Sequence, residues 1–210
     1  MTGAGAPRVL DAADPSSLDA ALDALQEGLV VGIPTDTVYG LAARIDRPAG
    51  MAAIFTAKGR PQGLALPVLV GRWRQVRTVA SSWPRTASML AARFWPGPLT
   101  VVVPVDPALG SHLGADGTSV GLRLPRQKFV QALCRRAGPL ATSSANVHDA
   151  PPCTTAAEVR GTFGVADVAL VIDGGTCDKE PSTVVDCRVS PPACLREGAI
   201  AWSWVEASVR

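Results

Sequence analysis

The apolar residues of this chain come in many short runs, most of which end at a proline, a glycine or a polar segment. Residues 29–34 (LVVGIP) and 99–105 (LTVVVPV) have the length and apolar character of buried strands. Residues 16–27 instead place leucines at helical spacing, between a serine start and a glycine stop. Strand candidates of this kind alternate with about six helical segments. The alternation predicts an α+β fold class with α/β-type layers.

The length and composition predict one domain. The chain has 210 residues, of which 47% are hydrophobic and 18% are charged. A chain of this length buries roughly 70% of the surface that it exposes when unfolded, so it needs no metal or disulfide merely to fold. The composition excludes a disordered chain, and no linker rich in proline, glycine and serine divides it. We therefore expect a single domain over residues 16–210, preceded by a mobile lead over residues 1–15.

The cysteines and histidines do not predict a metal centre. Five cysteines lack paired CxxC spacing, and two histidines are too few for a histidine-rich site. The N-terminus lacks the basic start and apolar core of a signal peptide. No apolar run approaches the ~18 residues of a membrane span. We therefore expect a cytoplasmic protein with no protein-bound metal site and no membrane partner.

The charge balance excludes a strongly basic protein. Twenty lysines and arginines face eighteen aspartates and glutamates, so contact with nucleic acid requires a local basic cluster. Only three of the twenty basic residues are lysines, which draws attention to Lys58. The chain has neither the GxxxxGK[ST] loop nor the GxGxxG fingerprint of common nucleotide sites, and no GxSxG nucleophile elbow.

Seven segments rich in polar residues and glycine punctuate the predicted strands and helices. In chain order they are PTDTVYGL (34–41), KGRP (58–61), WPGPLT (95–100), SVGLRLP (119–125), SSAN (143–146), PSTVVD (181–186) and LREG (195–198). Their order and spacing resemble the YrdC-type L-threonylcarbamoyladenylate (threonylcarbamoyl-AMP) synthases, in the short single-domain form. The resemblance extends over residues 16–200.

The resemblance implies both a fold and a reaction. The implied fold is a twisted open mixed sheet with flanking helices around a large basic cavity. The implied enzyme is a nucleotidyltransferase that converts ATP, L-threonine and bicarbonate (or CO2) into L-threonylcarbamoyl-AMP and pyrophosphate. A downstream threonylcarbamoyl transferase complex then uses this intermediate to modify the tRNA adenosine beside the anticodon. Mg2+ would accompany ATP, held mainly by phosphate oxygens and water, and direct binding of tRNA or double-stranded RNA is a further expectation.

The resemblance also assigns residues. By it, Lys58 and Arg60 are catalytic and bind ATP; lysine is a mobile point charge and arginine a planar fork, so the two would serve different phosphate oxygens. A guanidinium also suits the carboxylate of an amino acid. The further ATP-binding positions are Thr118, Ser144, Asn146 and Arg196. The L-threonine positions are Thr35, Arg123, Thr142 and Ser182.

Simpler local interpretations exist for four of these groups. Arg123 could pair with Asp116 or Asp106 on the surface, and residues 35–37 could form a turn after the strand.

Lys58 and Arg60 could form a basic pair at a helix C-terminus, where the helix dipole favours positive charge. Ser144 and Asn146 could form turn hydrogen bonds, which is compatible with nucleotide binding.

Two other functions stay open at this point. Residues 66–70, 147–149 and 181 differ from the family pattern, which favours a paralogue that adenylates another carbamoylated amino acid or serves another pathway. The second alternative is a non-catalytic module that binds tRNA or double-stranded RNA through a basic face. The candidate residues for that face are Arg72, Arg74, Arg77, Arg135 and Arg136.

Overall fold

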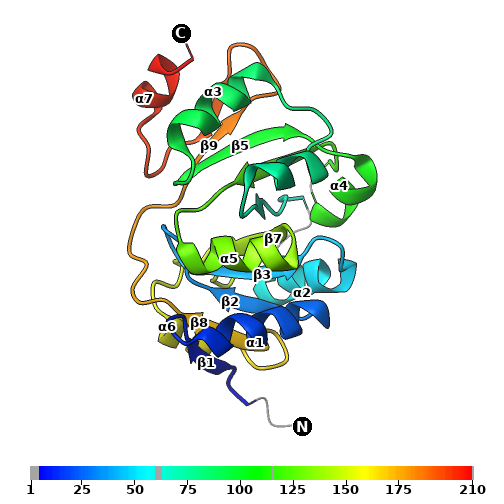
Figure 1. The fold of residues 1–210 in the computed structure, drawn as a ribbon, viewed down its shortest axis with the longest axis vertical. Coiled ribbons are helices and arrows are strands. Elements are labelled where there is room, and N and C mark those ends of the chain that lie inside the picture. The colour runs from blue at the N-terminus through cyan, green and yellow to red at the C-terminus, as the bar shows by residue number, and fades with distance from the viewer. Residues whose placement is uncertain (1–4, 60–62, 115, 210) are drawn as a thin grey trace.

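A ten-stranded sheet runs through the whole molecule (Figure 1). The computed structural model describes residues 5–59, 63–114 and 116–209. The strands are β1 (Arg8–Asp11), β2 (Val31–Ile33), β3 (Gly40–Arg44), β4 (Val68–Leu69), β5 (Leu99–Pro104), β6 (Ser119–Arg123), β7 (Leu140–Ser144), β8 (Leu170–Asp173), β9 (Thr183–Asp186) and β10 (Ala193–Arg196). Their order across the sheet is β1-β8-β2-β3-β7-β4-β6-β5-β9-β10.

The sheet is mixed and helices flank it. Strand pairs β1/β8, β2/β8, β4/β6 and β5/β9 are parallel, whereas the other neighbouring pairs are antiparallel. The helices are α1 (Pro15–Gln26), α2 (Pro48–Lys58), the 3-10 helix η1 (Trp73–Thr78), α3 (Arg85–Phe94), α4 (Pro107–Leu113), α5 (Lys128–Ala137), α6 (Ala156–Thr162) and α7 (Trp202–Ala207). None of these helices is long and apolar enough to cross a membrane, as far as the chain is described. The expected α+β fold with an open mixed sheet is confirmed.

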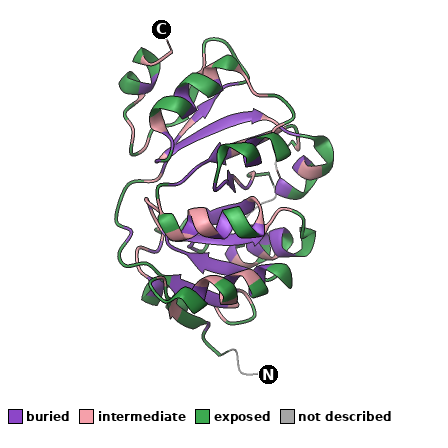
Figure 2. Ribbon diagram, in the orientation of Figure 1, coloured by how far each residue is buried: buried purple, intermediate pink, exposed green. Residues whose placement is uncertain are grey.

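Apolar side chains from the two faces of the sheet form two cores. In β3, Leu41 and Ala43 belong to the larger core, whereas Ala42 between them belongs to the smaller one, as strand geometry requires. The smaller core is closed by α1 and α5, and the larger one by α2, α3 and α6. Figure 2 shows the result, with buried strands at the centre and exposed outer faces on the helices.

Local sequence signals explain where the helices that flank the site begin and end. Helix α2 begins with Pro48, whose fixed backbone suits the first helical turn, and it ends at Gly59, which has a φ of 58°. Its last helical residue is therefore Lys58. Helix α5 is capped by the side chain of Gln127, which accepts a hydrogen bond from the Val130 backbone N–H.

The N-terminal segment differs from the expectation of a mobile lead over residues 1–15. Residues 8–11 form edge strand β1, which pairs in parallel with β8 so that Val9 lies opposite Val171. The Asp14 carboxylate then accepts from the Ser16 backbone N–H and begins helix α1. Composition gave no sign of this strand, because its partner lies about 160 residues further along the chain.

Helix α5 and the 3-10 helix η1 pack at van der Waals distance only because residue 71 has no side chain. A Cβ atom at Gly71 would lie 2.4 Å from the Gln131 carbonyl oxygen and 2.8 Å from the Arg135 backbone nitrogen. The Gln75 side chain bridges the same two elements, because it accepts from the Gly71 N–H at 2.8 Å and donates to the Cys134 carbonyl at 2.5 Å.

We expect Gly71→Ala to lower the free energy of unfolding by about 1–3 kcal/mol, because backbone atoms on both sides must move. The matched control is Gly161→Ala in α6, where an added Cβ meets nothing within 4 Å. That change is expected to raise the free energy of unfolding by up to about 1 kcal/mol, since alanine favours a helix. Urea unfolding measures both, and equal effects of the two variants would contradict the packing argument.

Candidate functional site

The ends of several central strands enclose a cavity of about 230 Å³. The cavity is lined by Thr35, Thr37, Val38, Tyr39, Gly40, Pro67, Leu69, Thr100, Arg123, Thr142, Ser143, Ser144, Pro152, Pro181, Ser182 and Arg196. Residues from β3, β4, β5, β6, β7 and β10 therefore meet at one site, although they are far apart in the sequence. All four residues predicted for L-threonine line it, as do two of the predicted ATP residues, Ser144 and Arg196.

Arg123, at the end of β6, is the most buried charged group of the cavity. It donates from Nε to the Gly97 carbonyl at 3.1 Å, from Nη1 to Thr37 Oγ1 at 3.1 Å and from Nη2 to Asp36 Oδ1 at 2.6 Å. Burial lowers the pKa of Arg123, Asp36 opposes that shift, and the nearby positive charge of Arg196 adds to it. The guanidinium has five N–H groups, so these three bonds leave donors for a ligand.

Asp36 holds Arg123 through only one of its two carboxylate oxygens. The other oxygen, Oδ2, is buried and has no hydrogen-bond partner within the described parts of the chain. A buried carboxylate oxygen without a partner is costly, and the adjacent guanidinium is the group that compensates it. The ion pair therefore fixes the arginine at the floor of the cavity rather than neutralising a surface charge.

Arg196, on the exposed edge strand β10, reaches over the cavity to Ser182. Its Nε and Nη2 atoms donate to the Ser182 carbonyl at 3.1 and 2.9 Å, and Nη2 also approaches Ser182 Oγ at 3.3 Å. Partial burial lowers the pKa of Arg196, and no carboxylate pairs with it among the ion pairs of the described residues. Arg123 is paired with Asp36 behind the cavity wall, and no described lining residue is a carboxylate, so Arg196 gives the cavity a surplus of positive charge.

The hydroxyl of Thr35 is fully used within its own turn. It donates to the Val38 carbonyl at 2.6 Å and accepts from the Thr37 backbone N–H at 3.1 Å. Because its proton goes to Val38, the 3.0 Å contact with Thr37 Oγ1 must have Thr37 as donor. Thr35 therefore meets the cavity through other atoms. The Thr142 hydroxyl donates to the Pro67 carbonyl at 3.3 Å, and the Thr142 backbone N–H donates to the same oxygen at 2.8 Å.

Lys58 does not line the cavity but lies buried beneath the loop that follows β7. Its Nζ donates to the Ser144 carbonyl and the Asn146 carbonyl, both at 2.6 Å, and to Asn146 Oδ1 at 2.9 Å. The side chain is 1% exposed. A lysine with this environment fixes the backbone of residues 144–146, which carries Ser144 into the cavity wall.

The Asn146 side chain is also occupied inside that loop. Its Oδ1 accepts from Lys58 Nζ and from Ser144 Oγ at 2.6 Å, and its Nδ2 donates to the carbonyls of Val147 and Ala150. The turn hydrogen bonds suggested by the sequence are therefore present. Asn146 shapes the loop, and Ser144 is the residue of the pair that lines the cavity.

Among the described residues, the predicted site residues that do not line the cavity are Lys58, Asn146 and Thr118. Thr118 is exposed just before β6, at the opposite end of this strand from Arg123, and its backbone N–H donates to Asp116. Arg60 lies outside the described residues. No group of three histidine, cysteine, aspartate or glutamate side chains among the described residues is arranged to hold a metal ion.

Four hydroxyl residues that line the cavity were not predicted as site residues, namely Thr37, Tyr39, Thr100 and Ser143. Two of them, Thr37 and Thr100, contact predicted site residues. Both lie inside segments that carried the family resemblance, at 34–41 and 95–100. Thr37 binds Arg123, and Thr100 shares a 2.8 Å hydrogen bond with Ser182. The sequence feature that could have identified Thr100 as a site residue is its hydroxyl at the start of an otherwise apolar strand.

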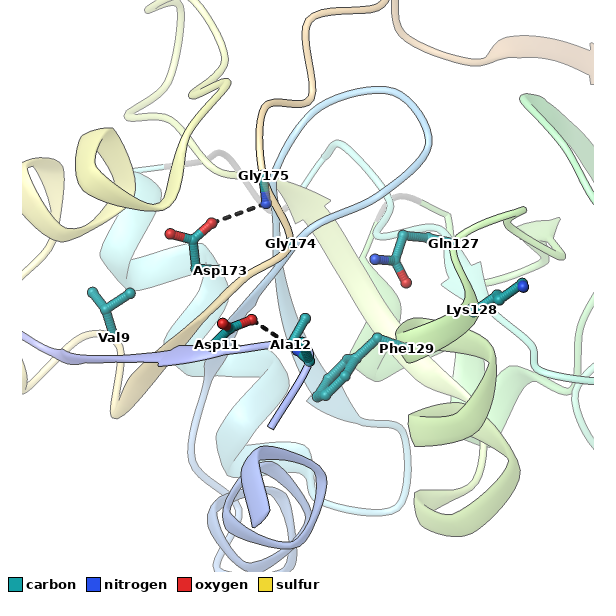
Figure 3. A pocket seen from close by; sticks show the side chains of 10 residues that line it. Val9, Asp11, Ala12, Gln127, Lys128, Phe129, Asp173, Gly174 and Gly175 are labelled. Atoms are coloured by element: carbon teal, nitrogen blue, oxygen red, sulfur yellow. Dashed lines mark hydrogen bonds between the residues drawn. The ribbon is translucent and has the colours of Figure 1, made fainter. Parts of the chain in front are cut away.

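Tyr39 connects this site to a second, larger cavity of about 580 Å³. Its hydroxyl donates to the Gly175 carbonyl at 2.8 Å and accepts from the Gly174 N–H at 3.1 Å, and burial raises its pKa to about 12. Figure 3 shows the second cavity, with Asp173 turned toward the Gly175 N–H and Lys128 on the far wall. None of the predicted site residues lines it.

Known proteins with similar sequences and folds belong to the family that the seven sequence segments indicated. The Sua5/YciO/YrdC family model, described as "Telomere recombination", matches residues 23–198. A Mycobacterium tuberculosis protein is 37% identical over 91% of this chain and 90% of its own length. The threonylcarbamoyl-AMP synthase of Bacillus subtilis is 36% identical over 93% of this chain and 57% of its own. The structure of Pyrococcus abyssi Sua5 complexed with L-threonine matches 96% of this chain and 60% of that one, at 32% identity and a TM-score of 0.85.

The family match spans strands β2 to β10 and every cavity-lining residue from Thr35 to Arg196. The extent and identity of the matches settle the family independently of the motifs. The chain belongs to the Sua5/YciO/YrdC family.

Proposed function

We propose that this protein is an L-threonylcarbamoyladenylate synthase, which converts ATP, L-threonine and bicarbonate (or CO2) into L-threonylcarbamoyl-AMP and pyrophosphate. The observation that carries the proposal is the cavity with two arginines and no carboxylate among its described lining residues. Such a site favours anionic ligands, and the reaction brings together a carboxylate, a carbamate and a triphosphate. The names of its relatives, and a relative's structure with L-threonine, support the same function.

L-Threonine fits the enclosed part of the site. A cavity of about 230 Å³ is large enough for an amino acid and too small to enclose a whole ATP molecule. We assign the α-carboxylate to the free N–H groups of Arg123 and to Ser182, and we assign the side-chain wall to Thr142 and Thr35. Because the Thr35 hydroxyl is already used, Thr35 shapes the pocket through its methyl group and backbone.

ATP then lies across the mouth of the cavity. Arg196 and Ser144 face it from β10 and from the end of β7. The guanidinium of Arg196 has N–H groups left for phosphate oxygens, whereas Ser144, whose proton goes to Asn146 Oδ1 in the loop after β7, can only accept there. Lys58 acts beneath that loop by fixing Ser144, and Arg60, two residues beyond it, is a proposed phosphate ligand. Thr118 stays a proposed contact at the outer end of β6.

The chemistry needs positioning more than acid–base groups. The threonine nitrogen bonds to CO2 and loses a proton to solvent, which gives a carbamate. A carbamate oxygen then attacks the α-phosphorus of ATP, the bond from that phosphorus to the pyrophosphate oxygen breaks, and pyrophosphate leaves. Arg196 and its neighbouring donors offset the negative charge that both reactants bring together.

Mg2+ enters as part of the ATP substrate. The described residues that line the cavity include no carboxylate, so the protein offers no dedicated ligand cage. Phosphate oxygens and water are the ligands that Mg2+ prefers in such sites. The ion lowers the charge of the triphosphate, while the arginines hold its position.

The product is a mixed anhydride, so its threonylcarbamoyl group must pass to an acceptor soon after it forms. The proposed acceptor is the tRNA adenosine beside the anticodon, through a transferase complex in the cytoplasm. A basic surface supports a tRNA partner: η1 and the end of α5 are joined by Gln75, and exposed arginines lie in or beside these two elements. These are Arg72, Arg74, Arg77, Arg135 and Arg136, the last of which pairs with Asp19.

Pyrophosphate release tests the function directly. We expect release by the purified protein to require ATP, Mg2+, L-threonine and bicarbonate together. Arg123→Lys keeps the buried positive charge next to Asp36 but removes the fork, so it should lower kcat/KM for L-threonine at least about tenfold. Arg126→Gln, on an exposed arginine outside the cavity, is the control and should leave it unchanged.

Each departure from that result has a distinct meaning. Release with a different amino acid would replace threonine but keep the mechanism. A folded protein that binds tRNA and releases no pyrophosphate with any amino acid would refute the enzyme and favour the binding module.

Lys58→Met tests whether the ammonium orders the loop. We expect it to leave the buried Asn146 carbonyl without a donor among the described residues and to remove one of two donors from the Ser144 carbonyl and from Asn146 Oδ1. It should lower the free energy of unfolding by roughly 1–3 kcal/mol and reduce pyrophosphate release strongly. Hydrogen exchange should accelerate at residues 144–148. Lys128→Met, on an exposed lysine, is the control. Lost activity with unchanged exchange in the loop would mean that Lys58 acts on the phosphates alone.

A further inference from the structure

Thr100, at the start of β5, and Ser182, just before β9, form a hydroxyl pair in the wall of the cavity. Their oxygens lie 2.8 Å apart, and both residues are buried, at 4% and 6% exposure. Both also line the cavity, so a bound ligand can reach the pair. Neither the family resemblance nor the sequence motifs gave Thr100 a role.

The number of protons in this pair determines what it offers to a ligand. Each hydroxyl carries one proton and accepts two hydrogen bonds. One proton is used between the two oxygens, and Ser182 Oγ also accepts from Arg196 Nη2 at 3.3 Å. No described protein atom accepts the second proton, so the pair has one donor left over whichever hydroxyl bonds to the other.

The left-over proton faces a group of other donors. Arg123 and Arg196 line the same cavity, and the positive charge of Arg196 helps to lower the pKa of Arg123, which places the two guanidinium groups within electrostatic reach. A site of this kind attracts an oxygen anion and repels a group that carries N–H donors. It therefore discriminates a carboxylate from a carboxamide.

Gly121, on the neighbouring strand β6, keeps Thr100 in this orientation. A Cβ atom at residue 121 would lie 2.8 Å from Thr100 Cγ2 and 3.5 Å from Pro67 Cβ. The missing side chain leaves room for the threonine methyl, and a β-branched side chain has few alternative χ1 rotamers. The Thr100 methyl therefore lies against Gly121, and the Thr100 hydroxyl bonds to the Ser182 hydroxyl. Together these two contacts fix the orientation of the Thr100 side chain.

We propose that Thr100 is a positioning residue for the carboxylate of the amino acid substrate, which acts by fixing the Thr100–Ser182 pair as a proton donor. This inference rests on the proposed function, because it takes an amino acid as the occupant of the cavity. It adds a residue that determines specificity, namely the preference for a free carboxylate at the α-carbon.

The experiment compares L-threonine with L-threoninamide, which has the same shape but carries a carboxamide. KM for L-threonine and for ATP is measured by pyrophosphate release, and Ki for L-threoninamide by competition. For Thr100→Val we expect KM for L-threonine to rise roughly tenfold. Ki for the amide and KM for ATP should change by less than about twofold, because neither ligand uses the donor.

Two further variants separate orientation from simple packing. Thr100→Ser keeps the hydroxyl and should retain a KM for L-threonine near that of the unchanged protein. Gly121→Ala forces the Thr100 methyl to move, so it should raise the same KM without removing any polar group. Thr78→Val, on an exposed threonine of η1, is the control, and thermal unfolding checks that each variant is folded.

The outcomes distinguish this inference from the proposed function. If the unchanged protein releases no pyrophosphate with L-threonine, the proposed function fails. If it does, and Thr100→Val leaves KM for L-threonine within twofold or raises Ki for the amide equally, the inference is overturned. A rise in KM for ATP alone would also overturn it, since the pair would then serve a phosphate.

Discussion

The buried ion pair between Arg123 and Asp36 is the contact on which the rest of the site depends. Through one guanidinium it joins the end of β6 to the turn after β2 and to the Gly97 carbonyl. Each partner is too buried to be solvated alone, so the pair holds three separate segments in one geometry. The neighbouring hydroxyls and Arg196 are arranged around this fixed charge.

Much of the fold was predictable from the sequence, and the failures have physical causes. Periodic segments such as α5 and apolar runs such as β5 can be predicted from their own residues alone. Strand β1 does not, because an edge strand of four mostly exposed residues is defined only by its distant partner β8. Helix α4 is seven residues long and depends on Asp106 as its cap, too short for a periodic signal.

The site was predictable as a set of positions but less so as a set of roles. The motifs identified six cavity residues, yet lysine is ordinarily exposed, and nothing local shows that Lys58 is buried beneath Ser144 and Asn146. Thr100 was missed for the same reason, since its meaning comes from Ser182, 82 positions away. Hydrogen-bond capacity depends on neighbours in space, which a motif does not contain.

The connection from β8 to β9 has a mechanical consequence. These strands are seven positions apart in the sheet order, about 33 Å at ~4.8 Å per strand in a flat sheet. Ten residue steps from Asp173 to Thr183 reach at most about 36 Å, so this crossing segment could only just span a fully flattened sheet (Figure 1). The length of this segment, here called the strap, therefore limits how far the opposite halves of the molecule can separate. The curvature of the sheet, and with it the width of the cavity mouth, is limited by the length of that strap, which Tyr39 anchors at its beginning.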